Sequence, residues 1–88
     1  KRGYALVQLG SDRDAIASFN KALKLKPDYA SAFYNKASCY ALRGDVGLAL
    51  DNLQQAIALN PRYREEAQSD IAFEELLDDE SFRQLVEA

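Results

Sequence analysis

Apolar residues recur at steps of three and four along most of the chain, which is the spacing of one face of an α-helix. One such stripe lies in the first quarter of the chain and consists of Ala15, Phe19, Ala22 and Leu23. The same stripe returns further on as Ala49, Leu53, Ala56 and Ile57. A third stripe precedes the second and consists of Phe33, Ala37, Tyr40 and Ala41. The pattern predicts an all-α chain in which each helix buries one face against its neighbours.

The two similar stripes belong to a longer internal repeat with a period of 34 residues. At this offset the identical pairs are Gly10 and Gly44, Ala15 and Ala49, Ala22 and Ala56, Leu25 and Leu59, Pro27 and Pro61, and Tyr29 and Tyr63. Identities at turn residues and at helical spacing together indicate a structural repeat rather than chance. Each unit is therefore predicted to form a pair of helices.

Residue types at the ends of the stripes predict where the helices stop. Gly10 and Gly44 suit the left-handed conformation that ends a helix. Ser11 and Asp45 follow directly and are predicted to cap the next helix. The prolines at the end of each unit are predicted to stop its second helix, since proline disfavours helical backbone in the residue before it. The first helices of successive units are then expected at about 1–9, 29–43 and 63–69.

The segment 30–61 resembles one complete tetratricopeptide repeat (TPR), with Phe33 in the aromatic slot, Ala37 in the small slot and Tyr40 in the tyrosine slot. Residues 3–27 resemble the same unit without its start. The resemblance implies an alpha-alpha superhelix, or TPR solenoid, of antiparallel helix pairs. We divide the chain into a partial repeat (1–27), a complete repeat (28–61) and C-terminal capping helices (62–88). The truncated first unit leads us to expect further repeats upstream.

After Pro61 the repeat fails and another spacing takes over. Residues three apart are Ala67, Asp70, Phe73, Leu76, Asp79, Phe82 and Leu85. This period is too short for one continuous α-helix, so we expect short helices near 63–69, 71–77 and 80–87, with caps at about Asp70 and Asp79. Their apolar residues can cover the open end of a solenoid, as in the terminal segment that closes many bacterial TPR proteins. The alternative is an exposed docking motif.

Charge and composition narrow the possible chemistry. Residues 1–44 carry eight Lys/Arg and three Asp, whereas 45–88 carry three Arg and eleven Asp/Glu. This acidity argues against a nucleic-acid partner, and no apolar run is long enough to span a bilayer. The chain has no His and one cysteine, Cys39, which we expect to be a buried small residue. The acidic run 74–80 lacks the alternating ligands and central glycine of a calcium loop. We expect no enzyme activity, no cofactor, no metal site and a cytoplasmic location.

In the family that the chain resembles, the first helix of each pair lines a concave groove. The polar and apolar residues left on that wall are the candidate partner-binding set, namely Tyr4, Gln8, Tyr34, Asn35, Ser38, Leu42 and Gln68. The leading hypothesis is therefore a scaffold module that binds a peptide or protein partner in the groove. The alternatives are self-assembly into a homo-oligomer, or the accessory C-terminal end of a larger enzyme.

One specific groove chemistry of the family is not expected. Chaperone-tail binders hold a C-terminal carboxylate with amide and basic side chains from three successive first helices. Asn35 matches this clamp, but Tyr4 stands where an asparagine is needed, and Glu65 and Ser69 stand where a lysine and an arginine are needed. A carboxylate that approached Glu65 would be repelled.

Overall fold

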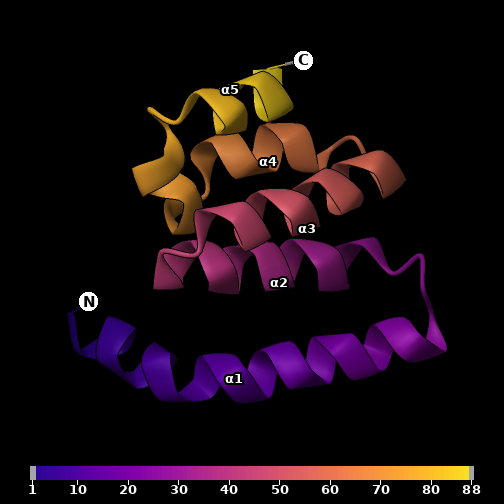
Figure 1. The fold of residues 1–88 in the computed structure, drawn as a ribbon, viewed down its shortest axis with the longest axis vertical. Helices are drawn as coiled ribbons and strands as arrows, with labels where there is room; N and C mark the ends of the chain where they lie inside the picture. The colour runs from indigo at the N-terminus through magenta and orange to yellow at the C-terminus, as the bar shows by residue number, and fades with distance from the viewer. Residues whose placement is uncertain (1, 88) are drawn as a thin grey trace.

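The computed structural model describes the backbone of residues 2–87 and the side chains of residues 13–87. The described helices are α1 (Arg2–Leu25), α2 (Ala30–Arg43), α3 (Val46–Leu59), α4 (Tyr63–Ser69), the 3-10 helix η1 (Ile71–Leu76) and α5 (Glu80–Glu87). Figure 1 shows the α-helices stacked in chain order, with α1 and α5 at opposite ends of the stack. The predicted all-α architecture of antiparallel helix pairs is confirmed.

The central pair, α2 and α3, turns back on itself at Gly44. This residue has a φ of 87°, in the left-handed region that glycine adopts without a steric penalty. Its backbone N–H donates to the carbonyl of Ala41, which satisfies one of the last carbonyls of α2. Ala37, Ala49 and Ala56 are fully buried. Small side chains at these positions let the two helices approach closely, as the apolar stripes predict.

The predicted proline stops are also found, because α1 ends at Leu25 and α3 ends at Leu59, each two residues before a proline. The predicted cap at Asp45 is only partly right. Asp45 occupies the residue before α3, but its side chain makes no capping hydrogen bond to the helix. Its carboxylate instead lies 3.6 Å from the guanidinium of Arg43. Asp45 therefore pairs with the last residue of α2 and does not cap α3.

The predicted break at Gly10 and Ser11 is wrong, since α1 runs through both residues as one helix. A glycine inside a helix costs only about 1 kcal/mol, whereas a turn forms when the two helices beside it bury enough surface against each other. At Gly44 two helices of 14 residues do so, with Ala37, Ala49 and Leu53 fully buried, whereas α1 continues through Gly10 without a turn. The expected helix 1–9 is thus the first part of α1. Tyr4 and Gln8 lie in it, and their side chains fall outside the described residues.

The C-terminal segment forms the three short helices that the three-residue spacing predicts. Both predicted caps are present: an Asp70 oxygen accepts from the backbone N–H of Ala72 at 2.9 Å, and an Asp79 oxygen accepts from that of Phe82 at 3.0 Å. The middle helix is of the 3-10 type and ends at Leu76 rather than residue 77. The fully buried side chains of Phe73 and Phe82 join the same core as α2 and α3.

The segment therefore shares one core with α2 and α3, and its role as the cap of the repeats stays a prediction. Leu76 and Val86 are buried with the two phenylalanines, and Leu85 packs half-buried against them. These side chains are not available as an exposed docking motif. Burial of phenylalanine contributes about 1.5–3 kcal/mol for each side chain, so the segment is part of the folded unit rather than an appendage.

Burial in the first half differs in detail from the sequence pattern. Among residues 13–25 of α1, whose side chains the structure describes, Ile16 is buried, whereas Phe19 and Leu23 from the predicted stripe are half-buried. In α2 the buried aromatic residue is Tyr34, and Phe33 packs half-buried against the core. Cys39 is half-buried rather than fully buried. The helical spacing thus predicts the buried stripe of α3 correctly, but in α2 it places Phe33 where Tyr34 turns fully inward.

Candidate functional site

Tyr34, a predicted groove residue, lies in the core, with only 4% of its surface exposed. Its ring stacks on that of Tyr63 in α4, with the ring centres 4.5 Å apart and the planes inclined by 16°. The ring of Phe73 in η1 lies 5.7 Å away at a tilt. The Tyr34 hydroxyl donates to the Asp70 carboxylate at 2.5 Å. The stacking face that the sequence offers to a partner is thus occupied by the chain itself.

The electrostatics around Tyr34 keep its hydroxyl protonated. Burial raises the pKa of Tyr34 far above its usual value of 10.0, and the hydrogen bond to Asp70 and the charge of that carboxylate raise it further. Burial also raises the pKa of Tyr63, with the charge of Glu66 as a smaller cause. Tyr34 therefore acts as a permanent hydrogen-bond donor that joins α2 to the start of η1.

Three other predicted groove residues lie on α2 with different exposure. Asn35 is exposed, and Leu42 has half of its surface in contact with solvent. Ser38 is half-buried, and its hydroxyl donates to the carbonyl of Tyr34 one turn back at 3.1 Å. Asn35 offers amide donors and acceptors, and Leu42 offers an apolar contact. These two are the groove residues of α2 that a partner can reach most easily.

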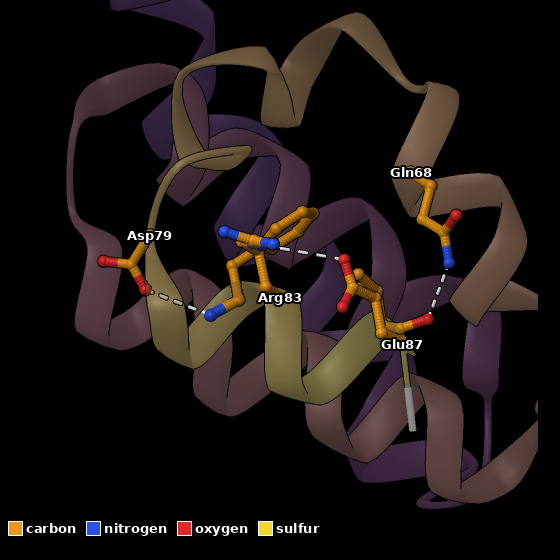
Figure 2. Close-up of polar contacts among 6 residues, drawn as sticks. Gln68, Asp79, Arg83 and Glu87 are labelled. Carbon is orange, nitrogen blue, oxygen red and sulfur yellow. Dashed lines mark hydrogen bonds and ion pairs between the residues drawn. The ribbon is translucent and has the colours of Figure 1, made fainter.

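Gln68 of α4 has a structural contact. Figure 2 shows its side chain directed towards the end of α5, where the amide nitrogen donates to the carbonyl of Val86 at 2.6 Å. The last carbonyls of a helix have no partner within the helix, so this bond satisfies one of them. In the same view the N-cap bond of Asp79 holds the start of α5, and Arg83 lies 3.6 Å from Glu87 along it. Gln68 thus ties α5 to α4.

A small hollow lies between the C-terminal half of α2 and η1. It measures about 230 Å³ and is lined by Ala41, Leu42, Ile71, Ala72, Glu74 and Glu75. We call it the α2–η1 slot. Of these residues only Leu42 belongs to the predicted groove set. Ala41 of α2 is not in that set, and the four residues of η1 belong to the segment expected to cap the fold. The three-residue spacing of that segment skips Ile71, which is the signal for an outward-facing apolar residue, and Ile71 is indeed 69% exposed.

A second, more polar hollow of about 500 Å³ lies at the turn between α3 and α4. It is lined by Asn60, Arg62, Tyr63, Glu65, Glu66 and Ser69. Glu65 and Ser69 are the residues that replace the basic side chains of the carboxylate clamp. Two carboxylates here face one guanidinium, that of Arg62, so the hollow does not present the net positive charge that an anionic peptide end needs.

Other chemistry is limited in the described part of the chain. Within residues 13–87 no three or more His, Cys, Asp and Glu side chains come together in a way that could hold a metal ion. None of the helices described is both long and apolar enough to cross a membrane. The features that remain for function are an exposed polar residue on α2, the α2–η1 slot and the surrounding charge.

The stacked helical pairs define the class of protein as a helical repeat, and comparison with known families identifies the repeat. Residues 3–44 match a family described as "TPR repeat", and residues 30–63 match one described as "Tetratricopeptide repeat". Residues 3–63 therefore carry tetratricopeptide repeats. No solved structure matches the chain significantly.

Among curated proteins the similar ones include tetratricopeptide repeat protein 36 from several animals. The mouse protein (Mus musculus) is 37% identical over 59 residues, which are 67% of this chain and 32% of the relative. The human protein (Homo sapiens) is 36% identical over 59 residues, 67% of this chain and 31% of the relative. The Caenorhabditis elegans protein is 37% identical over the same length, which is 33% of that relative. The matched part thus spans about a third of these relatives, which are eukaryotic.

Proposed function

We propose that this chain is a non-catalytic protein-interaction module that binds a segment of another protein along the exposed side of α2 and η1. The observation that carries the proposal is the exposure of Leu42 and Asn35 on α2, next to a hollow that the chain itself leaves empty. Tetratricopeptide repeats generally serve as surfaces for protein partners, and the repeat is present here over residues 3–63. Fold alone does not define the partner.

Fewer residues are proposed for partner contacts than the sequence indicates, because several of the predicted groove side chains contact the chain itself. Tyr34 and Gln68 stabilise the fold through Asp70 and Val86, and Ser38 is partly engaged with the backbone of its own helix. We assign partner contacts to Asn35 and Leu42 and keep Tyr4 and Gln8 as further candidates on α1. The domain division at 27 and 61, and the likeness of the closing segment to bacterial TPR proteins, belong to the same proposal.

A capture experiment with matched variants tests the proposal. The 88-residue chain is immobilised, exposed to extract from the source cell, and compared with the double variant Asn35→Ala, Leu42→Ser. The control is Leu48→Ser, which replaces an exposed leucine of α3 that lines none of the hollows described above. Retained proteins are quantified by mass spectrometry, and each variant is checked for helicity by circular dichroism.

We expect at least one protein to be retained equally by the parent chain and the Leu48 variant. The double variant should retain about tenfold less of that protein, which is equivalent to about 1.4 kcal/mol of binding free energy. Equal retention by all three folded chains would contradict it. If the chain retained mainly copies of itself, self-assembly would replace groove binding as the function.

A further inference from the structure

The α2–η1 slot combines two kinds of surface that together specify a ligand. Its apolar part is contributed by Leu42, which is 50% exposed, and Ile71, which is 69% exposed. Ala41 and Ala72 also line the slot, and their small side chains leave room for an incoming group. Exposed large apolar side chains that lie together mark interaction sites more often than isolated ones do.

The remaining wall of the slot is negative. Glu74 and Glu75 line it and are exposed. The stretch 70–80 contains six acidic residues and no lysine or arginine. Arg43, the cation next to Leu42 in the sequence, lies 3.6 Å from Asp45 and over the ring of Tyr40, with 5.9 Å to the ring centre. Its charge is therefore partly engaged by Asp45, and the field around the slot is that of the carboxylates.

We propose that the α2–η1 slot binds a peptide segment in which one large apolar side chain is flanked by lysine or arginine. This inference rests on the proposed function and names the chemistry of its partner. An apolar cavity of about 150 Å³ accepts a benzene ring, so a hollow of about 230 Å³ has room for one aromatic or branched side chain. The flanking cations then lie within reach of Glu74 and Glu75 at the rim of the slot.

Charge complementarity indicates which kind of peptide the slot binds. An acidic segment would place like charges against Glu74 and Glu75, and this repulsion is unfavourable. A neutral apolar segment would gain the contact with Leu42 and Ile71 but none of the electrostatic attraction. Pairing across an exposed rim contributes modestly for each charge, so both parts of the ligand are needed for measurable binding.

The test uses a defined probe and the 88-residue chain. The probe is a seven-residue peptide with one phenylalanine between two lysines in a glycine and serine background. Binding is followed by ¹H–¹⁵N correlation spectra, which report the amides that move. Control peptides replace the phenylalanine by serine or both lysines by glutamate. We expect saturable shifts centred on Leu42 and Ile71 with the probe, and a loss of affinity of about fivefold or more with either control.

Variants of the chain separate the two parts of the slot. Ile71→Ser should weaken binding by about fivefold or more, whereas Leu77→Ser, at a leucine just after η1 that is 44% exposed, should change it by less than about twofold. The pair Glu74→Gln, Glu75→Gln should weaken binding and flatten its dependence on salt. The matched pair Asp78→Asn, Glu80→Gln removes equal charge outside the slot and should have a smaller effect.

Several outcomes would overturn the inference. These are shifts that map away from the slot, equal binding of the glutamate peptide, and insensitivity to Ile71→Ser in a folded variant. Shifts at the slot that depend on protein concentration without the probe would assign it to a second copy of the chain. If cellular partners depend on Leu42 but the probe does not bind, the inference fails while the proposed function stands.

Discussion

The Tyr34 hydroxyl of α2 donates a 2.5 Å hydrogen bond to the carboxylate of Asp70, which lies 36 residues further along the chain. The other oxygen of that carboxylate accepts from the backbone N–H of Ala72 and caps η1. One side chain thus both joins the repeat to the closing segment and starts the helix that forms one wall of the slot. The shape of the slot depends on this contact.

Removal of the hydroxyl should weaken the fold. Tyr34→Phe keeps the stacked ring but deletes a hydrogen bond to a charged group, so the free energy of unfolding should fall by about 2 kcal/mol. Urea denaturation followed by circular dichroism measures it. Tyr63→Phe is the matched control, because it changes the other ring of the same stack and should cost less. Equal losses in the two variants would show that the Asp70 bond contributes little.

The same tyrosine predicts a dependence of stability on alkaline pH. Burial holds the pKa of folded Tyr34 above the value of 10.0 expected in the unfolded chain. Its contribution is therefore fully present below pH 10 and is lost as the pH rises further, by at most about 1.4 kcal/mol for each pH unit.

Comparison with Tyr34→Phe isolates this effect. Burial lowers the pKa of Lys36, and burial raises that of Tyr63, so both also affect stability at alkaline pH. Both groups are present in the two chains, and their contributions largely cancel in the difference. The free energies of unfolding at pH 8, 9, 10 and 11 should show a gap between the chains that narrows above pH 10. A gap that stays constant to pH 11 would contradict the assigned role of burial.

Two glycines near the α2–α3 turn should respond in opposite directions to the same substitution. Gly44→Ala places a Cβ on a left-handed residue with φ of 87°, which costs about 1–2 kcal/mol. Gly47 lies in α3, and a Cβ there meets nothing within 4 Å, so Gly47→Ala should stabilise the chain by up to about 1 kcal/mol. Thermal or urea unfolding compares the two variants. If both substitutions destabilised the chain, the turn at Gly44 would not be what distinguishes the two glycines.

The sequence predicts the helices well because their signals are local. The prolines at 27 and 61 and the capping residues Asp70 and Asp79 each act on backbone within a few residues. Gly10 is the exception: whether a glycine ends a helix depends on how much surface the flanking helices bury, which a local pattern does not contain. Gly44 differs from Gly10 because it lies between two long apolar stripes.

The candidate site was predicted less completely than the helices. The burial of Tyr34 is decided by Tyr63, Phe73 and Asp70, which follow the repeat and approach α2 only in the folded chain. For the same reason the sequence does not reveal that Ile71 lies beside Leu42. Long-range contacts of this kind follow from how η1 packs on α2, so the slot could be found only in the structure.

The absence of a carboxylate clamp can be tested with peptides. A peptide that ends in an acidic residue and a free carboxylate should not bind the chain with low-micromolar affinity, because Glu65 and Glu66 stand at the hollow between α3 and α4. Fluorescence anisotropy against the same peptide with an amidated end measures this. Low-micromolar binding that requires the free carboxylate would refute the prediction.

Site-specific photo-crosslinking tests the central claim most directly, since it reports contact rather than stability. The photoreactive residue p-benzoylphenylalanine replaces Leu42 in one chain and Leu59, an exposed leucine at the end of α3, in the other. Both chains are irradiated in extract from the source cell, and crosslinked proteins are identified by mass spectrometry. We expect a distinct partner to be crosslinked from position 42 and not from position 59. Crosslinking of the same proteins from both positions, or none from position 42, would contradict partner binding at the exposed side of α2.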